Sequence, residues 1–186
     1  RRGAVHVVFL NSDGTAKSVT KIASSTGGGP MLAETHYFGI SVTSMGDLDG
    51  DGFADLAVGA RGDDTGGSNR GTVYVLFMYA DGTVKTSTKI ASDTGGGPTL
   101  ADFDLFGSSV TGVGDLDGDG VPVLAGGAGG DDTGGRRRGA VYGRLLGTDG
   151  TGEGSADVGS DNRGGPTPAH RRLFRACRAA GGALGG

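Results

Sequence analysis

The fold of this 186-residue chain can be argued from one segment, Gly46-Asp47-Leu48-Asp49-Gly50-Asp51-Gly52-Phe53-Ala54-Asp55. It places carboxylates at positions 1, 3, 5 and 9 of a loop, so that four negative charges are crowded together. Such charges repel one another unless a cation lies among them, and oxygen ligands in a flexible loop suit Ca²⁺. Gly52 supplies a sharp turn, and the carbonyl of Phe53 can add a backbone ligand. The sequence therefore predicts a calcium site, the alternative being an Asp- and Gly-rich surface turn without a metal.

The residues after the loop decide what kind of calcium loop this is. An EF-hand needs a bidentate Glu at position 12 and a helix beyond it, but position 12 is Val58. The segment Asp55-Leu56-Ala57-Val58-Gly59-Ala60 is short and apolar and has no helical periodicity, which is typical of a buried strand. The loop is therefore expected to join two strands of a β-hairpin.

The chain repeats itself with one dominant period. The block that begins at Arg2-Gly3 returns at Arg70-Gly71 and begins again, at the same spacing, at Arg138-Gly139. The acidic loop likewise returns one period later as Asp115-Leu116-Asp117-Gly118-Asp119-Gly120. A repeat at the spacing from Arg2 to Arg70 indicates a supersecondary unit that stacks on copies of itself.

One period contains four segments typical of short strands, which we expect at residues 38–43, 55–60, 71–78 and, more weakly, 84–92. The acidic loop joins the first two, and Asp81-Gly82 is a hairpin signal between the last two. Four antiparallel strands per repeat form the blade of a β-propeller. The predicted fold class is therefore all-β, an incomplete propeller of about two full blades with partial ones.

The combination of Phe38-Gly39, the acidic loop and Leu56-Ala57-Val58-Gly59-Ala60 resembles the FG-GAP repeat of integrin α-subunit propellers and their relatives. The resemblance implies Ca²⁺ in the hairpin between the first two strands of a blade. Its metal ligands would be Asp47, Asp49, Asp51, Phe53 (carbonyl) and Asp55 in the first loop, and Asp115, Asp117, Asp119 and Val121 (carbonyl) in the second. Val123 replaces the ninth-position Asp of the second loop, so we expect that site to bind more weakly.

The repeat also sets the expected domain boundaries. We expect the C-terminal strands of a partial blade in residues 1–35, a complete blade in 36–103, another partial blade in 104–142 and an aberrant Gly- and Arg-rich tail in 143–186. Reading the coding sequence one nucleotide later after Tyr142 permits repeat-like residues in register, so the tail is predicted to be out-of-frame or disordered. The alternative is a genuine basic tail with an anion-binding patch at residues 170–175.

Composition restricts the functional classes. The chain has 21 Asp and Glu against 17 Lys and Arg, and the acidic excess lies in residues 1–133, which argues against nucleic acid as a partner. It has no run of eighteen apolar residues that would predict a membrane span, and none of the common catalytic motifs. The chain begins at Arg1 without a signal-like segment, which suggests a fragment.

The resemblance implies extracellular or cell-surface binding or adhesion without catalysis, with Ca²⁺ in a structural role. The expected partners are an unidentified protein or glycan, together with further blades of the same chain or other copies, because a propeller needs about four to eight blades. The alternatives are an accessory propeller of a larger secreted hydrolase or lipase, and a carbohydrate-binding propeller. The absence of Trp and an aromatic content of 6% count against the last. Arg61-Gly62-Asp63 spells a tripeptide that many integrins bind, but it does not recur in the repeat, so a binding role for it is less favoured.

Overall fold

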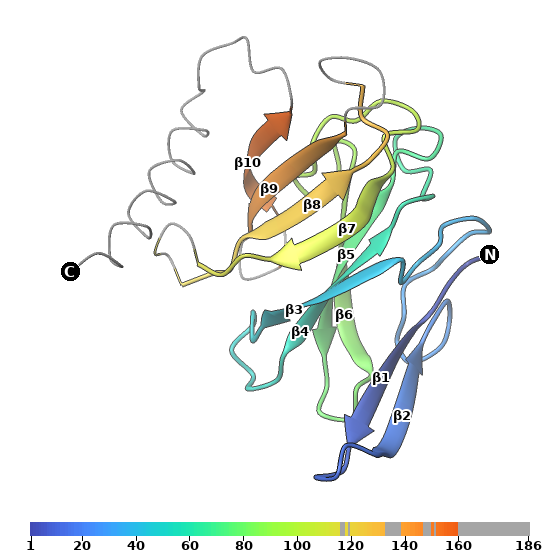
Figure 1. The fold of residues 1–186 in the computed structure, drawn as a ribbon, viewed down its shortest axis with the longest axis vertical. Coiled ribbons are helices and arrows are strands. Elements are labelled where there is room, and N and C mark those ends of the chain that lie inside the picture. Colours follow the sequence, from blue (N-terminus) through green and yellow to red (C-terminus); the bar gives the residue numbers. More distant parts are fainter. Residues whose placement is uncertain (116–117, 119, 133–138, 147–149, 151, 160–186) are drawn as a thin grey trace.

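The computed structural model describes residues 1–115, 118, 120–132, 139–146, 150 and 152–159. Within these ranges the chain is all-β and has no helix, which confirms the predicted fold class. Across the same residues, no helix is therefore long and apolar enough to cross a membrane. The ten strands (Figure 1) are β1 (Val5–Leu10), β2 (Ala16–Ile22), β3 (Ser41–Gly46), β4 (Asp55–Ala60), β5 (Thr72–Met78), β6 (Val84–Ala91), β7 (Phe106–Gly112), β8 (Leu124–Ala128), β9 (Ala140–Leu146) and β10 (Gly152–Gly159).

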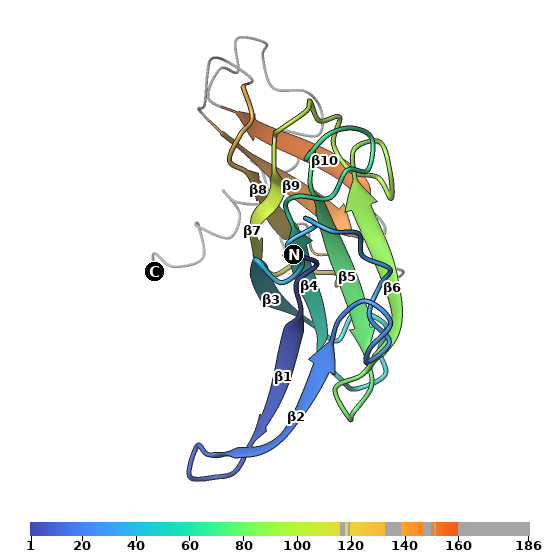
Figure 2. The same cartoon turned by 90° about the vertical axis from the view of Figure 1, so that its right-hand side faces the viewer.

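The strands form three antiparallel sheets, each of which follows the order of the sequence. One sheet is β3-β4-β5-β6, another is β7-β8-β9-β10, and β1 and β2 form a two-stranded sheet. Since β1 and β2 lie one period before β5 and β6, they correspond to the last two strands of a blade. The three sheets lie next to one another in sequence order (Figure 2).

The strand bounds agree with the sequence pattern except at β3. The second strand was predicted at residues 55–60 and lies at Asp55–Ala60, but the first was expected at 38–43 and lies at Ser41–Gly46. Tyr37 and Gly39 have positive φ values of 54° and 85°, which interrupt an extended ladder. Phe38 instead forms an isolated parallel bridge with Gly3 of the preceding blade.

The third sheet extends beyond residue 142, where we expected the partial blade to end. Strand β9 pairs with β8 from Ala140↔Ala128 to Arg144↔Leu124, and β10 continues the sheet to Gly159. Backbone pairing needs no particular side chain, so the register that residues 140–142 set is continued by the residues that follow. Residues 160–186, the rest of the expected aberrant tail, lie outside the described residues.

Strand β5 is the centre of the packing because both of its faces are buried. Its residues Val73, Val75 and Phe77 belong to a core cluster shared with β7, β8 and β9, and the alternate residues Tyr74, Leu76 and Met78 belong to a second cluster shared with β1 and β2. A strand buried on both faces has a continuous apolar sequence. This is why Val73-Tyr74-Val75-Leu76-Phe77-Met78 lacks the alternation of an exposed strand.

The contacts between neighbouring sheets repeat with the period of the sequence. The bridge Gly3↔Phe38 returns as Gly71↔Phe106. A Cβ placed on Gly82 would lie 3.0 Å from the Phe9 ring, and one on Gly150 would lie 3.1 Å from the Phe77 ring. The three sheets therefore stack with the same geometry, as blades of one propeller do.

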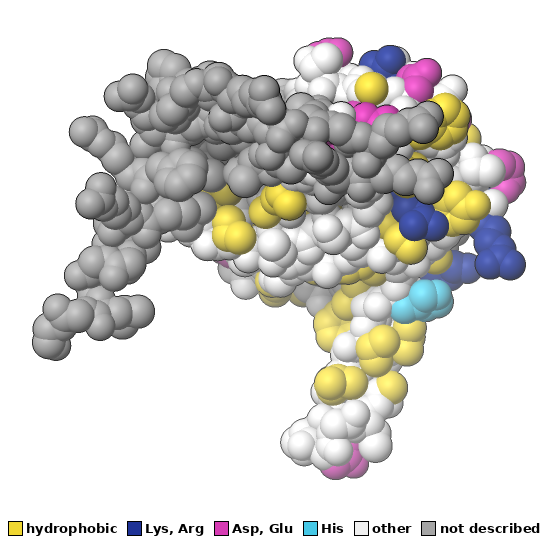
Figure 3. All heavy atoms as spheres, turned by 45° about the horizontal axis from the view of Figure 1, so that its top comes forward, with side chains coloured by type: hydrophobic (Ala, Val, Ile, Leu, Met, Phe, Trp, Pro, Cys, Tyr) yellow, Lys and Arg dark blue, Asp and Glu magenta, His cyan; other side chains and the backbone are white. Residues whose placement is uncertain are grey.

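An uncovered apolar face remains on the β1–β2 sheet. Val8 and Leu10 are 46% and 61% exposed, whereas their counterparts Leu76 and Met78 are buried against the neighbouring sheet. In Figure 3 hydrophobic side chains are visible along the part of the molecule that projects from the body. A preceding blade would cover this face in a closed propeller.

Candidate metal centre

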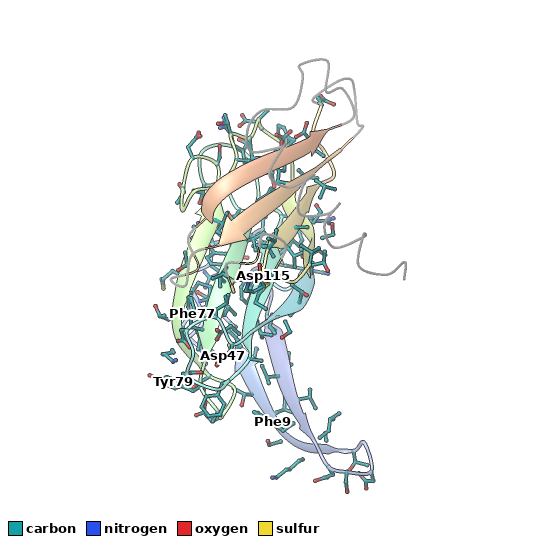
Figure 4. All side chains as sticks on the ribbon, turned by 90° about the vertical axis from the view of Figure 1, so that its left-hand side faces the viewer. Phe9, Asp47, Phe77, Tyr79 and Asp115 are labelled. Carbon is teal, nitrogen blue, oxygen red and sulfur yellow. The ribbon has the colours of Figure 1, made fainter. Side chains whose placement is uncertain are left out.

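The acidic loop joins β3 to β4 at the end of the sheet where the β5–β6 hairpin also turns. Figure 4 shows Asp47 at this end, close to Tyr79 at the start of that hairpin, with Asp115 farther along the molecule in the next blade. The hairpin turn is the one predicted at Asp81-Gly82: Gly82 donates its N–H to the Tyr79 carbonyl at 2.9 Å. Strand pairing thus places the β5–β6 hairpin beside the loop.

Asp47 organises the backbone of the loop. Its Oδ1 accepts hydrogen bonds from the N–H groups of Gly50 (2.8 Å) and Asp51 (3.0 Å), and its Oδ2 accepts one from Gly52 (2.8 Å). Gly52 has a φ of 91° and makes the predicted sharp turn, a conformation that is strained for other residues. Each carboxylate oxygen has two lone pairs, so these bonds leave acceptor capacity for a cation.

Asp55 ties the loop to the core of the blade. Its side chain is fully buried, and it accepts hydrogen bonds of 2.9 Å from the N–H groups of Leu48 in the loop and Met78 at the end of β5. Burial raises the pKa of Asp55, the two hydrogen bonds oppose this, and the nearby charges of Asp49 and Asp51 add to it. The position of this carboxylate is thus fixed by two backbone segments.

Three of the four predicted carboxylates in the first loop converge. Asp47, Asp49 and Asp55 each offer an oxygen atom within 4.8 Å of the others. The fourth, Asp51, accepts a 2.9 Å hydrogen bond from the Phe53 N–H. The donors are all oxygen atoms, which hard cations such as Ca²⁺ prefer. The first loop therefore has donor atoms of the right kind, close together, for such an ion.

A lysine that sequence reasoning missed lies against this cluster. Lys85 Nζ lies 2.8 Å from Asp49 Oδ2 and also contacts Asp51 Oδ2. The hydrogen bonds that Lys85 donates to Asp49 and Asp51 raise the pKa of Lys85, and the bond that Asp51 accepts from Lys85 is the main cause that lowers the pKa of Asp51. In the sequence, the only hint was that the hairpin returns a basic residue to the end of the sheet that holds the loop.

The second loop begins in the same way as the first. Asp115 Oδ1 accepts a hydrogen bond from Gly118 (2.7 Å) and Oδ2 one from Gly120 (2.9 Å), as Asp47 does from Gly50 and Gly52. Asp117 and Asp119 lie outside the described residues. Val121 is partly buried against a core cluster.

Val123, at the position of Asp55, is buried and pairs through its backbone with Val113 and Gly114. A valine side chain offers no ligand atom and cannot repeat the bonds of Asp55. The sequence difference between the loops is therefore also a difference in how each loop is attached to its blade.

The Arg61-Gly62-Asp63 triplet does not present its carboxylate. Asp63 is 1% exposed and accepts hydrogen bonds from the hydroxyls of Tyr74 (2.9 Å) and Thr65 (2.5 Å), while Lys89 Nζ lies 3.0 Å from its Oδ2. The Arg61 guanidinium lies 5.5 Å from the centre of the Tyr37 ring. The triplet is thus part of the internal packing of the blade.

The arginines that recur before the third strand of a blade, Arg2 and Arg70, pair with acidic residues in turns. Arg70 Nε lies 2.9 Å from Asp102 Oδ1, and Arg2 Nε lies 3.2 Å from Glu34 Oε1. Glu34 and Asp102 are themselves one period apart, as Arg2 and Arg70 are. Stacking of the sheets creates these pairs, because each arginine precedes the third strand of one blade and its partner precedes the first strand of the next.

Comparison with known proteins identifies one repeat by its family pattern. Residues 38–76 match the FG-GAP repeat. Integrin alpha-5 of Xenopus laevis is 40% identical over 102 residues, which are 55% of this chain and 9% of that protein. Integrin alpha-V of Gallus gallus is 33% identical over 141 residues, 70% of this chain and 13% of that protein. Integrin alpha pat-2 of Caenorhabditis briggsae is 42% identical over 93 residues, 49% of this chain and 7% of that protein. The chain thus spans only a small part of the length of these relatives.

Proposed function

We propose that this chain, which contains an FG-GAP repeat and is similar to integrin α subunits, is a calcium-stiffened propeller module for extracellular or cell-surface binding. The observation that carries the proposal is the convergence of Asp47, Asp49 and Asp55 within an FG-GAP repeat. The module is assigned no catalytic residue. It would act by presenting a rigid surface to a partner.

In this proposal the ligands of the first loop are Asp47, Asp49, Asp51, Asp55 and the Phe53 carbonyl. Bound Ca²⁺ would supply positive charge that offsets the repulsion among these carboxylates. Asp55 links the loop to the blade, because it accepts hydrogen bonds both from Leu48 in the loop and from Met78 in β5. A loop held in one conformation would therefore also hold the ends of β4 and β5.

The second loop would use Asp115, Asp117, Asp119 and the Val121 carbonyl. It has three carboxylates where the first loop has four, and affinity in calcium loops follows the charge of the ligand set. We therefore expect the second site to bind Ca²⁺ more weakly than the first.

The partners follow from the surfaces of the module. The uncovered face of the β1–β2 sheet supports packing against a further blade of the natural protein or against another copy. The similarity to integrin α subunits supports a protein or glycan ligand outside the cell. The acidic composition disfavours nucleic acid.

Calcium titration by isothermal calorimetry tests this function. The full chain is stripped with EDTA, titrated with CaCl₂ and compared with Asp49→Asn, which removes a proposed ligand. The control is Asp13→Asn, a change in the exposed β1–β2 turn. A structural ion should raise the free energy of unfolding by about 2.7 kcal/mol at 100 times its Kd. Absence of both heat and thermal stabilisation at millimolar CaCl₂ would refute the calcium role.

A further inference from the structure

We propose that Lys85 is a built-in competitor for the first metal loop: its ammonium group pairs with the loop carboxylates when the metal is absent and must be displaced when the metal binds. This inference rests on the proposed function, because it concerns how tightly that loop would bind Ca²⁺. It assigns Lys85 the role of setting the affinity of the site, a role distinct from that of a ligand.

The geometry places the ammonium group on two of the proposed ligands. Lys85 Nζ is 2.8 Å from Asp49 Oδ2 and contacts Asp51 Oδ2, the carboxylates at positions 3 and 5 of the loop. Lys85 is the second residue of β6, so strand pairing fixes the point from which its side chain reaches the loop. Its side chain is only 26% exposed, which shows that it lies along the molecular surface.

Electrostatic repulsion disfavours the presence of both the Lys85 ammonium group and a metal ion at the loop carboxylates. An ammonium group held by Asp49 and Asp51 would lie within a few ångströms of a divalent cation held by the same carboxylates. Two positive charges at that separation repel each other, and each lowers the negative charge that attracts the other. Metal binding would therefore require Lys85 to move, and the free energy of its two contacts would be subtracted from the affinity of the loop.

A second resting place for the ammonium group is already present. Lys85 Nζ lies 5.8 Å from the centre of the Tyr79 ring, and Tyr79 is 53% exposed. A lysine that leaves the carboxylates can stay over the aromatic face, where a cation is favoured, and can regain water. Displacement therefore needs only a rotation of one long side chain, without a change in the strands.

The other positions in the same register offer a matched comparison. The counterpart one period earlier is Lys17, which is exposed in β2. The counterpart one period later is Glu153, so the repeat with the second loop has the opposite charge there. Among the described residues, the contact between a lysine and an acidic loop is observed in the β3–β6 blade.

Replacing Lys85 should lower the stability of the metal-free protein but tighten its binding of Ca²⁺. Without metal, Lys85→Gln leaves the loop carboxylates without their counter-ion, so the midpoint of thermal unfolding in EDTA should fall. With metal, the competitor is gone, so the Kd for Ca²⁺ should become smaller. A lysine that only supported the fold would lower stability in both conditions and would not tighten binding.

Calorimetric titration of two matched proteins tests the competition. Both are the full chain with Asp117→Asn, which weakens the second loop so that the first dominates the heats, and one also has Lys85→Gln. We expect a Kd for Ca²⁺ about two- to fivefold smaller in Lys85→Gln, the scale of one partly exposed ion pair, and a smaller difference at high salt. In the same Asp117→Asn background, Lys85→Arg, which keeps the charge, should bind Ca²⁺ about as tightly as the protein with Lys85. Lys17→Gln should leave the Kd for Ca²⁺ unchanged.

The outcomes separate this inference from the proposed function. Equal or weaker binding in Lys85→Gln overturns the competition but leaves the calcium loop in place. No binding in either protein overturns both, even if the EDTA melting point falls. Tighter binding in Lys85→Gln, wild-type affinity in Lys85→Arg and a lower melting point in EDTA for Lys85→Gln support the proposal.

Discussion

The Tyr74 hydroxyl donates a hydrogen bond of 2.9 Å to Asp63 Oδ2, and both side chains are buried. This bond joins β5 to the turn that follows β4, and it recurs one period later between Tyr142 and Asp131. Lys89 and His36 also lie against Asp63, at 3.0 Å and 3.1 Å from Oδ2. The carboxylate therefore organises the end of the blade opposite the acidic loop.

Removing the Tyr74 hydroxyl should destabilise the blade. In Tyr74→Phe the ring is kept, but Asp63 loses a buried donor, and a hydrogen bond to a charged group contributes about 1.5–3 kcal/mol. We expect the free energy of unfolding in urea to fall by about 1–2 kcal/mol, since Lys89 and Thr65 still bind the carboxylate. Tyr79→Phe, at an exposed tyrosine, is the control and should have no effect. Equal stability of the two variants would show that the bond contributes nothing.

Protonation of Asp63 in acid should lower the stability of the folded protein. Burial alone would raise the pKa of Asp63, but hydrogen bonds from Thr65 and Lys89 and the charge of Lys89 hold it below the usual 3.8. A carboxyl group with a lowered folded-state pKa contributes stability that is present above about 3.8 and is lost as the pH falls through its folded pKa. Urea denaturation between pH 6 and pH 2.5 should show this loss. Asp63→Asn should flatten the acid limb, and an unchanged limb would contradict the assignment.

Exchanging residues between equivalent positions should change stability in opposite directions. His36 lies beside Asp63, whereas its counterpart Asp104 is buried near the charge of Asp131. Burial raises the pKa of Asp104, and Asp131 and Asp132 add to the shift. We expect Asp104→His to stabilise the protein and His36→Asp to destabilise it, each by about 1 kcal/mol, because carboxylates placed close together repel each other. Calorimetric melting points would report both, and shifts of the same sign would refute the explanation.

The bridge between blades should not tolerate a side chain at Gly71. Its φ is 84°, and a Cβ there would lie 2.1 Å from the Phe106 carbonyl oxygen. We expect Gly71→Ala to lower the free energy of unfolding by more than about 2 kcal/mol, the left-handed strain plus a backbone clash. Gly14→Ala separates the two effects, because Gly14 has the same φ of 84° with no atom within 4 Å of the added Cβ. It should cost only about 1–2 kcal/mol. If Gly71→Ala and Gly14→Ala lower the free energy of unfolding equally, the close approach of Gly71 to Phe106 does not contribute to the effect.

Asp55 should stabilise the folded protein even when calcium is absent. Asp55→Val, which copies Val123 of the second loop, removes the acceptor for the Leu48 and Met78 N–H groups. Unsatisfied buried donors cost about 1–3 kcal/mol each, so we expect the loss of two acceptor bonds to lower the free energy of unfolding in EDTA by about 2–6 kcal/mol. Calcium affinity should also fall. Asp51→Asn, whose carboxylate is partly exposed, should weaken calcium binding with little effect in EDTA. A normal melting point for Asp55→Val in EDTA would show that the two bonds are dispensable.

Local patterns in the sequence were enough for much of the blade. The alternate carboxylates from Asp47 to Asp55 and the apolar run after them predicted a loop that opens into β4, and β4 spans the predicted residues. The repeat period, together with the Asp81-Gly82 turn, predicted the order and pairing of the four strands. These features depend on neighbours in the chain, on turn chemistry and on the alternation of side chains along a strand, so the sequence alone determined them.

Tertiary structure decided which distant side chains meet. Lys85 reaches Asp49 and Asp51 because β6 lies at the same end of the sheet as the loop, 36 residues away for Asp49. Arg70 pairs with Asp102 because two blades stack, and stacking also gives β5 two buried faces. Such contacts depend on strand register and on the distance between sheets, which no local spacing encodes. The sequence by itself therefore determined the blade and its acidic loop, and the packing of the blades decided the charge that lies against that loop.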